Sequence, residues 1–473
     1  MQEIFLKFHD KIKMGVSKLK IDLLFAEIGS TTTVVTAFHN IDGNVKILSQ
    51  GEHWTTVNEG DVTIGIEKAI ARLKEKIGEK NISWSKFAAS SSAAGGLKMT
   101  VHGLVYDMTV RAAREAALGA GAVIKYVTAG KMDEFHIQKI LEIQPKLILL
   151  AGGVDYGEKE TVIYNAKILS KLELDIPIIY AGNIAAAEHV EYILKSAGKT
   201  VFVTENVYPK IDQLNVEPTR NIIKEVFAQH ITKAPGMEKI YDIVDYKIHT
   251  TPGAVMKTTQ LLSEIYGDVL TVDIGGATTD IDSVTEGSVE IQEIMISPEP
   301  TAKRTVEGDL GLFVNARNVI NLMGEENLRE EFPNLSELKE RISPYPKSDE
   351  DEKFISRLAL YCFQQGIRRH VGVKKHIYTP LGRKLVAEGK DLSAVRFLFG
   401  TGGFLSRSKY ADKVLKSINT LSKLHPMELL PQNEVEIYRD KHYIFAAIGV
   451  IATEIDKNIA RKILEKNLEK LGG

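Results

Sequence analysis

The chain has 473 residues, of which 44% are hydrophobic and 26% charged, as expected for a globular protein of about two to three domains. The net charge of −2 gives no general attraction to nucleic acid, and no apolar run is long enough to predict a transmembrane helix. The single cysteine, Cys362, excludes an intrachain disulfide and a cysteine metal cluster, and its apolar neighbours place it in a helix core. We therefore expect a cytoplasmic protein that binds neither nucleic acid nor membrane.

Residues 1–20 form a basic, amphipathic stretch that carries Lys7, Lys11, Lys13, Lys18 and Lys20. The stretch lacks the apolar core and the small-residue cleavage site of a signal peptide. We interpret it as a short solvated extension before the first strand, with membrane-surface binding as the alternative.

A strand–turn–strand unit follows at residues 24–35. Glu27 stands near the end of an apolar strand, Gly29 allows a tight turn, and Ser30, Thr31 and Thr32 supply small hydroxyl side chains. Backbone N–H groups at the tip of such a turn can hold phosphate oxygens. The unit lacks the glycine and lysine spacing of a P-loop.

The following segment alternates strands with helices. Apolar patterns predict strands at residues 34–38, 45–50, 87–92 and 101–106 and helices at 61–79 and 107–121. Residues 135–205 predict parallel βαβ units. Two strands there end in Gly152-Gly153 and Gly182-Asn183, which we interpret as strand-to-helix turns in preference to a ligand site.

The same unit recurs about 250 residues later, at residues 269–284. Asp273 takes the acidic position, Gly275 and Gly276 form the turn, and Thr278 supplies a hydroxyl beyond it. Two copies of one pattern predict two related halves that meet at one phosphate chain. Asp273 is the candidate that binds Mg²⁺, directly or through water, or orients an attacking water, with Glu27 as its weaker partner.

A third glycine-rich segment lies in the last quarter. A strand at residues 396–399 precedes Gly400, Gly402 and Gly403, and a helix at 408–419 follows. This arrangement allows close approach of the backbone to a ligand. Elsewhere in this region we predict a charged, solvated insertion at about 325–352 and helices at 351–366, 375–386 and 445–471.

These three sites, in this order, resemble those of the actin–Hsp70–sugar kinase superfamily. The resemblance implies an α/β fold of duplicated ribonuclease-H-like domains, with ATP bound in the cleft between the halves. It assigns residues 29–33 and 273–280 as the phosphate loops and 400–403 as the loop on the adenosine side. We divide the chain accordingly into the extension 1–20, a first half 21–205 that includes the α/β segment, a helical connector 206–266 and a second half 267–473.

Further blocks are similar to the MutL/GlmL family, which is encoded beside glutamate mutase and is unrelated to the mismatch-repair protein of that name. They are residues 90–97, 149–155, 181–183, 272–280 and 307–311. The resemblance implies an ATP-dependent, chaperone-like accessory protein that reactivates an adenosylcobalamin-dependent aminomutase, with ATP and Mg²⁺ as cofactors and the mutase subunits as partners. The client mutase and the oligomeric state are left open.

One position departs from the superfamily pattern. Members usually carry Asp where this chain has Glu27, whose carboxylate sits about 1.5 Å further from the backbone. Slow ATP hydrolysis, or binding without turnover, would follow from altered Mg²⁺ geometry. A small-molecule kinase of the same fold and a nucleotide-binding scaffold therefore remain as alternatives to the reactivating ATPase.

Overall fold

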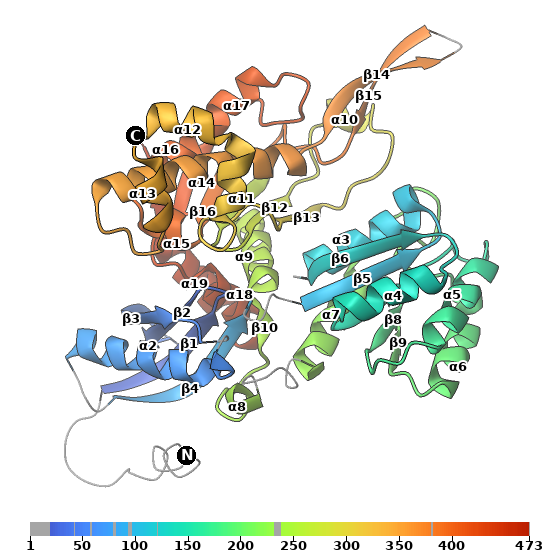
Figure 1. Cartoon of the computed structure of the whole chain (residues 1–473), viewed down its shortest axis with the longest axis horizontal. Coiled ribbons are helices and arrows are strands. Elements are labelled where there is room, and N and C mark those ends of the chain that lie inside the picture. Colours follow the sequence, from blue (N-terminus) through green and yellow to red (C-terminus); the bar gives the residue numbers. More distant parts are fainter. Residues whose placement is uncertain are drawn as a thin grey trace.

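The computed structural model describes residues 19–41, 43–56, 59–78, 82–92, 97–120, 122–230, 238–379 and 382–472. Its strands form three large sheets and one two-stranded hairpin. Figure 1 shows two of the sheets in one body, with the third in a separate α/β lobe beside it. The proposed extension at 1–20 lies almost wholly outside the described residues, as do residues 93–96 of the block at 90–97.

The first half is built on a five-stranded sheet of order β10-β4-β1-β2-β3. Its strands are β1 (Leu19–Ile28), β2 (Thr32–His39), β3 (Lys46–Trp54), β4 (Ile82–Ser91) and β10 (His249–Thr250). β2 runs antiparallel to both β1 and β3, whereas β4 is parallel to β1 and β10 to β4. Helix α2 (Val62–Ile77) begins at the Asp61 cap and buries Ile66, Ala69 and Leu73 against this sheet.

The second half repeats this arrangement in a six-stranded sheet of order β13-β12-β11-β16-β17-β18. Its strands are β11 (Val269–Ile274), β12 (Thr279–Val284), β13 (Ala302–Glu307), β16 (Phe397–Thr401), β17 (Glu436–Asp440) and β18 (Leu468–Lys470). Three antiparallel strands again come first, followed by two parallel ones. Apart from the extra edge strand β18, both sheets follow the spatial order 3-2-1-4-5. This repeat confirms the expected duplicated ribonuclease-H-like fold.

The two halves share one apolar core. It combines Phe25 of β1 and Val269 of β11 with residues of two helices that cross between the sheets, α9 (Thr251–Tyr266) and α18 (Phe445–Glu454). Gly449 of α18 lies so close to the Ala254 carbonyl of α9 that a side chain there would overlap it. Helices α9 and α18 therefore pack in close contact where they join the two halves.

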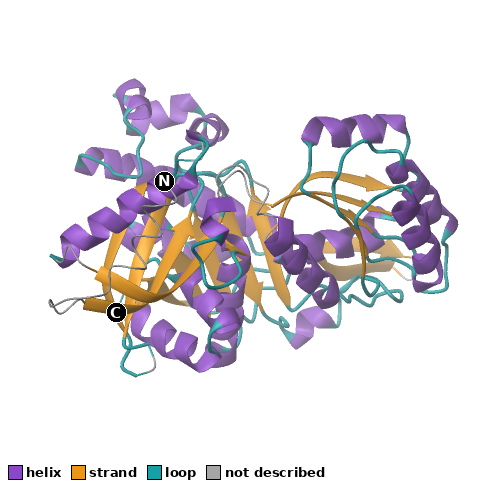
Figure 2. Ribbon diagram, turned by 90° about the horizontal axis from the view of Figure 1, so that it is seen from below, coloured by secondary structure: helices purple, strands orange, loops and turns teal. Residues whose placement is uncertain are grey.

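The third sheet, of order β6-β5-β7-β8-β9, is fully parallel and defines an inserted domain. Its strands are β5 (Leu97–Gly103), β6 (Ala122–Ala129), β7 (Leu147–Leu150), β8 (Ile178–Tyr180) and β9 (Val201–Val203). Helices α3 (Arg111–Gly119), α4 (Glu134–Ile143), α5 (Glu160–Ser170) and α6 (Ala187–Ser196) connect them, and α7 (Glu217–His230) follows. This is a doubly wound sheet with apolar cores on both faces. Figure 2 shows its strands between two layers of helices.

Short helices complete the lobes. They are η3 (Tyr106–Val110), η4 (Ile184–Ala186), α8 (Glu238–Tyr241), α10 (Val289–Gln292), α11 (Ala316–Met323), α12 (Glu325–Glu331), α13 (Leu335–Glu340), α15 (Gly403–Arg407), α16 (Ala411–Lys416), α17 (Ile418–Leu424) and α19 (Lys457–Asn467). The long helix α14 (Asp349–His370) packs under the second sheet and buries Cys362, whose pKa burial raises to about 12. The cysteine is thus part of the packing, as predicted.

One predicted helix was wrong, and another is divided into two helices. Residues 375–379 and 382–386 lie in an antiparallel hairpin, β14 (Val373–Thr379) and β15 (Gly382–Glu388), which projects from the body in Figure 1, and residues 380–381 lie outside the described part of the chain. Their lysines and leucines suit a helix, but the β-branched residues favour strands once the two segments pair, and Gly382 supplies a positive φ of 109° next to the turn. The closing helix at 445–471 is broken at Ile455 and Asp456, where Asp456 caps a second helix, α19.

Candidate functional site

The turns of the two repeated hairpins have the same backbone structure. The Gly29 N–H donates to the Thr32 carbonyl at 3.0 Å, and the Gly275 N–H donates to the Thr278 carbonyl at 2.9 Å. The cross-strand pairs next to the turns, Ile28 with Thr33 and Ile274 with Thr279, also correspond. The repeated sequence pattern therefore produces a repeated turn.

The two turns meet tip to tip. A side chain on Gly276 would overlap the Thr31 hydroxyl of the other half. This hydroxyl is buried and has no hydrogen-bond partner among the described residues. A buried donor without a partner costs about 1–3 kcal/mol, so the junction carries an unused hydrogen-bonding group where a phosphate oxygen could accept. Ser30 lies exposed beside it.

Glu27 is the acidic residue of the first hairpin. It is 5% exposed, and its Oε1 accepts a hydrogen bond of 2.6 Å from the Tyr443 hydroxyl. The backbone of Tyr443 has a φ of 52°. Burial raises the pKa of Glu27 to about 8; the Tyr443 hydrogen bond opposes this shift, and the charge of Asp273 adds to it. Arg407 stacks over the Tyr443 ring and pairs with Glu52 of β3, which ties the two halves together here.

Asp273 is the acidic residue of the second hairpin and lies directly across the strand pair from Asp280. Burial raises the pKa of Asp273 to about 7, with a further contribution from the Asp280 charge. Asp282 is two residues further along the same face, where Arg304 of β13 is its cross-strand partner. Three carboxylates and one guanidinium thus share the face of the second sheet that looks toward the first half.

Arg304 is almost fully buried and balances this charge in part. Its Nη2 contacts Asp280 at 2.7 Å, and its Nε lies 3.9 Å from Asp282. Asp282 has a pKa well above its usual range, chiefly because of burial, while Arg304 opposes the shift. Sequence analysis missed Arg304 and Asp282, since only pairing of β12 with β13 places them beside Asp273.

Asp440 is a third strand-end acid that sequence analysis missed. It ends β17 and accepts hydrogen bonds from the N–H groups of Ile444, the residue before α18, and Phe445, the first residue of α18, and from Thr401 and Asn467. Burial raises its pKa, and these donors oppose the shift. Asp440 therefore fixes α18 and the third glycine segment, and its position between a strand and a helix was the signal available in the sequence.

The three predicted glycines of the third segment differ in their surroundings. A side chain on Gly402, at a φ of 95°, would lie 2.7 Å from Asp273 Oδ1 and 2.5 Å from the Ile274 carbonyl. At Gly400 it would meet Leu415, so packing accounts for that glycine, whereas Gly403 faces open space. The structure thus brings Gly402 to Asp273, leaves Gly403 open beside it in the chain, and gives Gly400 a packing role.

The remaining predicted residues form the wall of the second turn. The carbonyls of Gly275 and Gly276 accept from the N–H groups of residues 312–314, and the Thr278 hydroxyl donates to Asp280 at 3.1 Å. The block at 307–311 precedes this contact, and Gly311 lies against Ala277. That block therefore supports the turn from behind.

Within the described residues, no group of three or more His, Cys, Asp or Glu side chains is arranged to hold a metal ion. A Mg²⁺ ion commonly takes one or two carboxylates from a protein and its other ligands from water and phosphate, and Asp273 and Glu27 stay the predicted ligands. No helix of the described chain is long and apolar enough to span a membrane.

The repeated sheets and their facing turns define a two-lobed protein of the actin-like, duplicated ribonuclease-H class, enlarged by a doubly wound domain. Residues 23–468 match the family model described as MutL protein, and the chain belongs to the MutL family. It is 37% identical over 464 residues to Protein MutL of Clostridium tetanomorphum, which covers 95% of this chain and 99% of that protein. The family resemblance inferred from the sequence blocks is confirmed.

Solved structures align over most of the chain at low similarity. A nucleotide-free acetone carboxylase shares 13% identity at a TM-score of 0.39, covering 91% of this chain and 70% of the carboxylase. A ligand-bound xylulose kinase from Lactobacillus acidophilus shares 10% identity at a TM-score of 0.35, covering 96% and 93%. The fold assignment rests instead on the strand order of the two sheets.

Proposed function

We propose that the chain binds MgATP between its two halves, with the paired hairpin turns as phosphate loops. The observation that supports this most is the unpartnered, buried Thr31 hydroxyl at the contact between the turns. Thr31, together with Ser30 and the backbone of Thr32, would donate to phosphate oxygens from the first half. Gly275, Gly276 and Thr278 would clamp the phosphates from the second half, where the Gly275 N–H is bonded to the Thr278 carbonyl and shapes the turn.

Asp273 and Glu27 are proposed to hold Mg²⁺ and to orient the attacking water. Both carboxyls have raised pKa values, chiefly because burial disfavours ionisation. The charge of Asp273 adds to the shift at Glu27 and that of Asp280 to the shift at Asp273, and a divalent cation relieves these penalties. Gly402 and Gly403 give the backbone clearance on the adenosine side. When bound, MgATP supplies a phosphoanhydride bond whose hydrolysis drives the change in conformation.

The proposed task is the maintenance of an adenosylcobalamin-dependent aminomutase in the cytoplasm. Membership of the MutL family, together with its resemblance to mutase accessory proteins, supports this assignment. A protein that binds one conformation of its client more tightly in one nucleotide state shifts the client's population toward that conformation. The inserted domain, which is extra to the two halves, is the part most suited to contact such a client.

Release of inorganic phosphate from ATP without an added acceptor tests the enzymatic part of the proposal. The wild type should release phosphate, and Asp273→Asn should release it at least about 100-fold more slowly, although its melting curve remains cooperative. Dependence of turnover on a small acceptor would point to a kinase instead.

Affinity capture from the native cytoplasm, with ATP in one arm and ADP in the other, tests the proposed partner. We expect a cobalamin-dependent mutase to be recovered in one arm.

A nucleotide-binding scaffold without turnover is the second candidate, favoured by Glu27. This side chain is longer than the usual Asp and is already held by the Tyr443 hydroxyl. Its raised pKa also reduces the ionised fraction at neutral pH. A nucleotide-dependent rise in melting temperature with no phosphate release would establish this alternative.

A further inference from the structure

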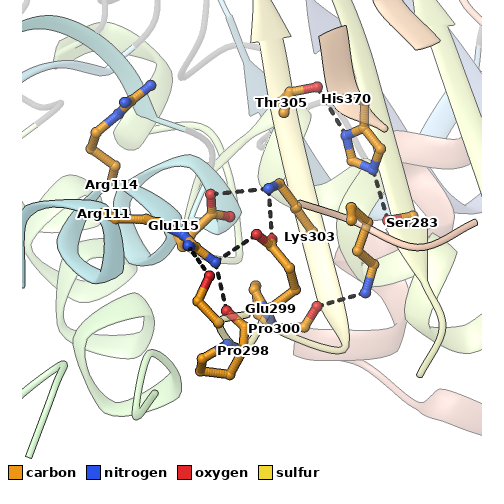
Figure 3. A network of polar contacts seen from close by, with 12 residues as sticks. Arg111, Arg114, Glu115, Ser283, Pro298, Glu299, Pro300, Lys303, Thr305 and His370 are labelled. Atoms are coloured by element: carbon orange, nitrogen blue, oxygen red, sulfur yellow. Dashed lines mark hydrogen bonds and ion pairs between the residues drawn. The ribbon is translucent and has the colours of Figure 1, made fainter. Parts of the chain in front are cut away.

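The inserted domain is fastened to the second half along one face of helix α3. The contacting groups come from residues 111, 115 and 118, a spacing that puts them on one side of the helix. Opposite them lie β13 and the loop that precedes it. Figure 3 shows Arg111 and Glu115 on the helix and Glu299 and Lys303 facing them.

The first turns of α3 are fixed by charged contacts remote from the candidate site. Arg111 donates to the Pro298 carbonyl and pairs with Glu299, both at 2.6 Å. Lys303 lies 2.7 Å from Glu299 and 3.5 Å from Glu115, so one cation joins the loop to the helix. All of these side chains are largely removed from solvent, which strengthens their attraction.

The last turn of α3 is held differently, because its contact also belongs to the carboxylate cluster. Arg304 Nη1 donates to the Leu118 carbonyl at 2.7 Å, while Nη2 of the same guanidinium contacts Asp280 at 2.7 Å. The guanidinium is planar and rigid, so a movement that improves one of these bonds alters the other. Asp280 in turn lies directly across from Asp273.

We infer that Arg304 is a positioning residue that couples ligand state at Asp273 to the position of the inserted domain. The inference rests on the proposed function, since MgATP is the ligand that changes the charge beside Asp273. A cation beside Asp273 competes with Arg304 for the neighbouring carboxylates. Phosphate oxygens in turn attract the guanidinium of Arg304. Either change alters the bond to Leu118, while Arg111 and Glu115 keep the start of the helix in place.

The chain contains a matched control for this role. Arg220 of α7 is also buried, at 2% exposed against 1% for Arg304, and it also joins the inserted domain to β13, through the Ala302 carbonyl at 2.8 Å. Its carboxylate partner is Glu217 on its own helix. Arg220 therefore shares the burial and the bridging position of Arg304. Its charge lowers the pKa of Asp282 from a distance, but within the described part of the chain it makes no direct hydrogen bond or ion pair with Asp280 or Asp282.

Amide hydrogen exchange of α3 with and without MgATP tests the inference, with nucleotide affinity measured by calorimetry on the same samples. In the wild type we expect MgATP to change exchange rates in the last turn of α3 by about fivefold or more, the lower range of ordinary coupling between sites. Arg304→Lys, which keeps the charge but loses the planar fork, should abolish this change. Arg220→Lys should retain it.

An unchanged exchange response in Arg304→Lys would overturn the inference. If that variant does not fold, Asp280→Asn tests the same link from the acidic side, and it too should lose the response. If the wild type binds MgATP without any change in the exchange rates of α3, the inference is overturned and the proposed function stands. Failure of the wild type to bind MgATP overturns the proposed function and the inference with it.

Discussion

The two repeated hairpins have the same turn but different electrostatic surroundings. In the first, Glu27 lies beside Tyr443 and near Arg407, residues that come from the other half. In the second, Asp273 lies beside Asp280, within a face that also holds Asp282 and Arg304 of its own sheet. The first acid thus contacts the opposite half, whereas the second belongs to a charged cluster that extends to the inserted domain.

This difference shows how a duplicated fold acquires unequal roles. The backbone of each turn is set by a local glycine and its hydrogen bond, which duplication preserves. The chemistry of each carboxylate is set by neighbours from distant strands, which are free to diverge. We therefore expect the second hairpin to dominate turnover and the first to report the contact between the halves.

The largest predicted effect concerns the two acids themselves. Asp273→Asn should reduce phosphate release by about 100-fold or more, the range found when a group that orients or activates the nucleophile is removed. Glu27→Gln should reduce phosphate release by about tenfold, because the longer Glu27 side chain is the weaker partner of Asp273. Single-turnover phosphate release under saturating MgATP measures both, and equal losses would contradict the proposed ranking.

The next largest effect is the loss of stability when a methyl group is added to the glycine of each turn. A side chain on Gly29 would lie 2.6 Å from the Thr32 carbonyl oxygen, against 3.2 Å for Gly275 and the Thr278 oxygen. Gly29→Ala should therefore lower the free energy of unfolding by about 2 kcal/mol, and Gly275→Ala by about 1 kcal/mol or less. Urea denaturation measures both. Gly403→Ala, which meets no neighbouring atom, is the control and should be nearly neutral.

The pH dependence of stability distinguishes Glu27 from Asp273, because the two carboxyls lower the free energy of unfolding over different pH ranges. A carboxyl with a raised folded pKa keeps a proton that the unfolded chain has lost, so the free energy of unfolding falls as pH rises. The slope is about 1.4 kcal/mol per pH unit for each group, up to a pH of about 8 for Glu27 and about 7 for Asp273.

Relative to the wild type, Glu27→Gln should therefore make the decline shallower up to a pH of about 8. Asp273→Asn should make it shallower only up to a pH of about 7. Urea midpoints between pH 5 and pH 9 give both curves. Superimposable curves for the two variants would show that the acids do not differ in their surroundings as described.

The smallest predicted effect concerns Thr31. Thr31→Val removes a buried hydroxyl that has no partner, so it should raise the free energy of unfolding by up to about 1 kcal/mol without nucleotide. It should also weaken nucleotide binding by about tenfold, because the hydroxyl is the proposed phosphate donor. Calorimetry and urea denaturation give the two values. Ser30→Ala, at an exposed position, is the control for stability.

The sequence predicted the fold well because its strongest signals are local. A strand, a glycine turn and a second strand occur within about a dozen residues, and both copies fold as their patterns indicate. Tyr443 could not be predicted in the same way, since it reaches Glu27 from 416 residues away. The helix predicted at 375–386 failed for the related reason that pairing between two strands outweighed the local composition.

The boundaries of the inserted domain have an evolutionary consequence. β4 enters the insertion after Ser91, and the chain returns at Thr250 as the direct parallel neighbour of that residue. Paired strands lie about 4.8 Å apart, so the insertion begins and ends at adjacent points of the first sheet. A segment with neighbouring ends can be lost, lengthened or exchanged without disturbing the strands that carry the two turns. The two-lobed body can therefore be fitted with different inserted domains over time, each joined at the same pair of neighbouring strand ends.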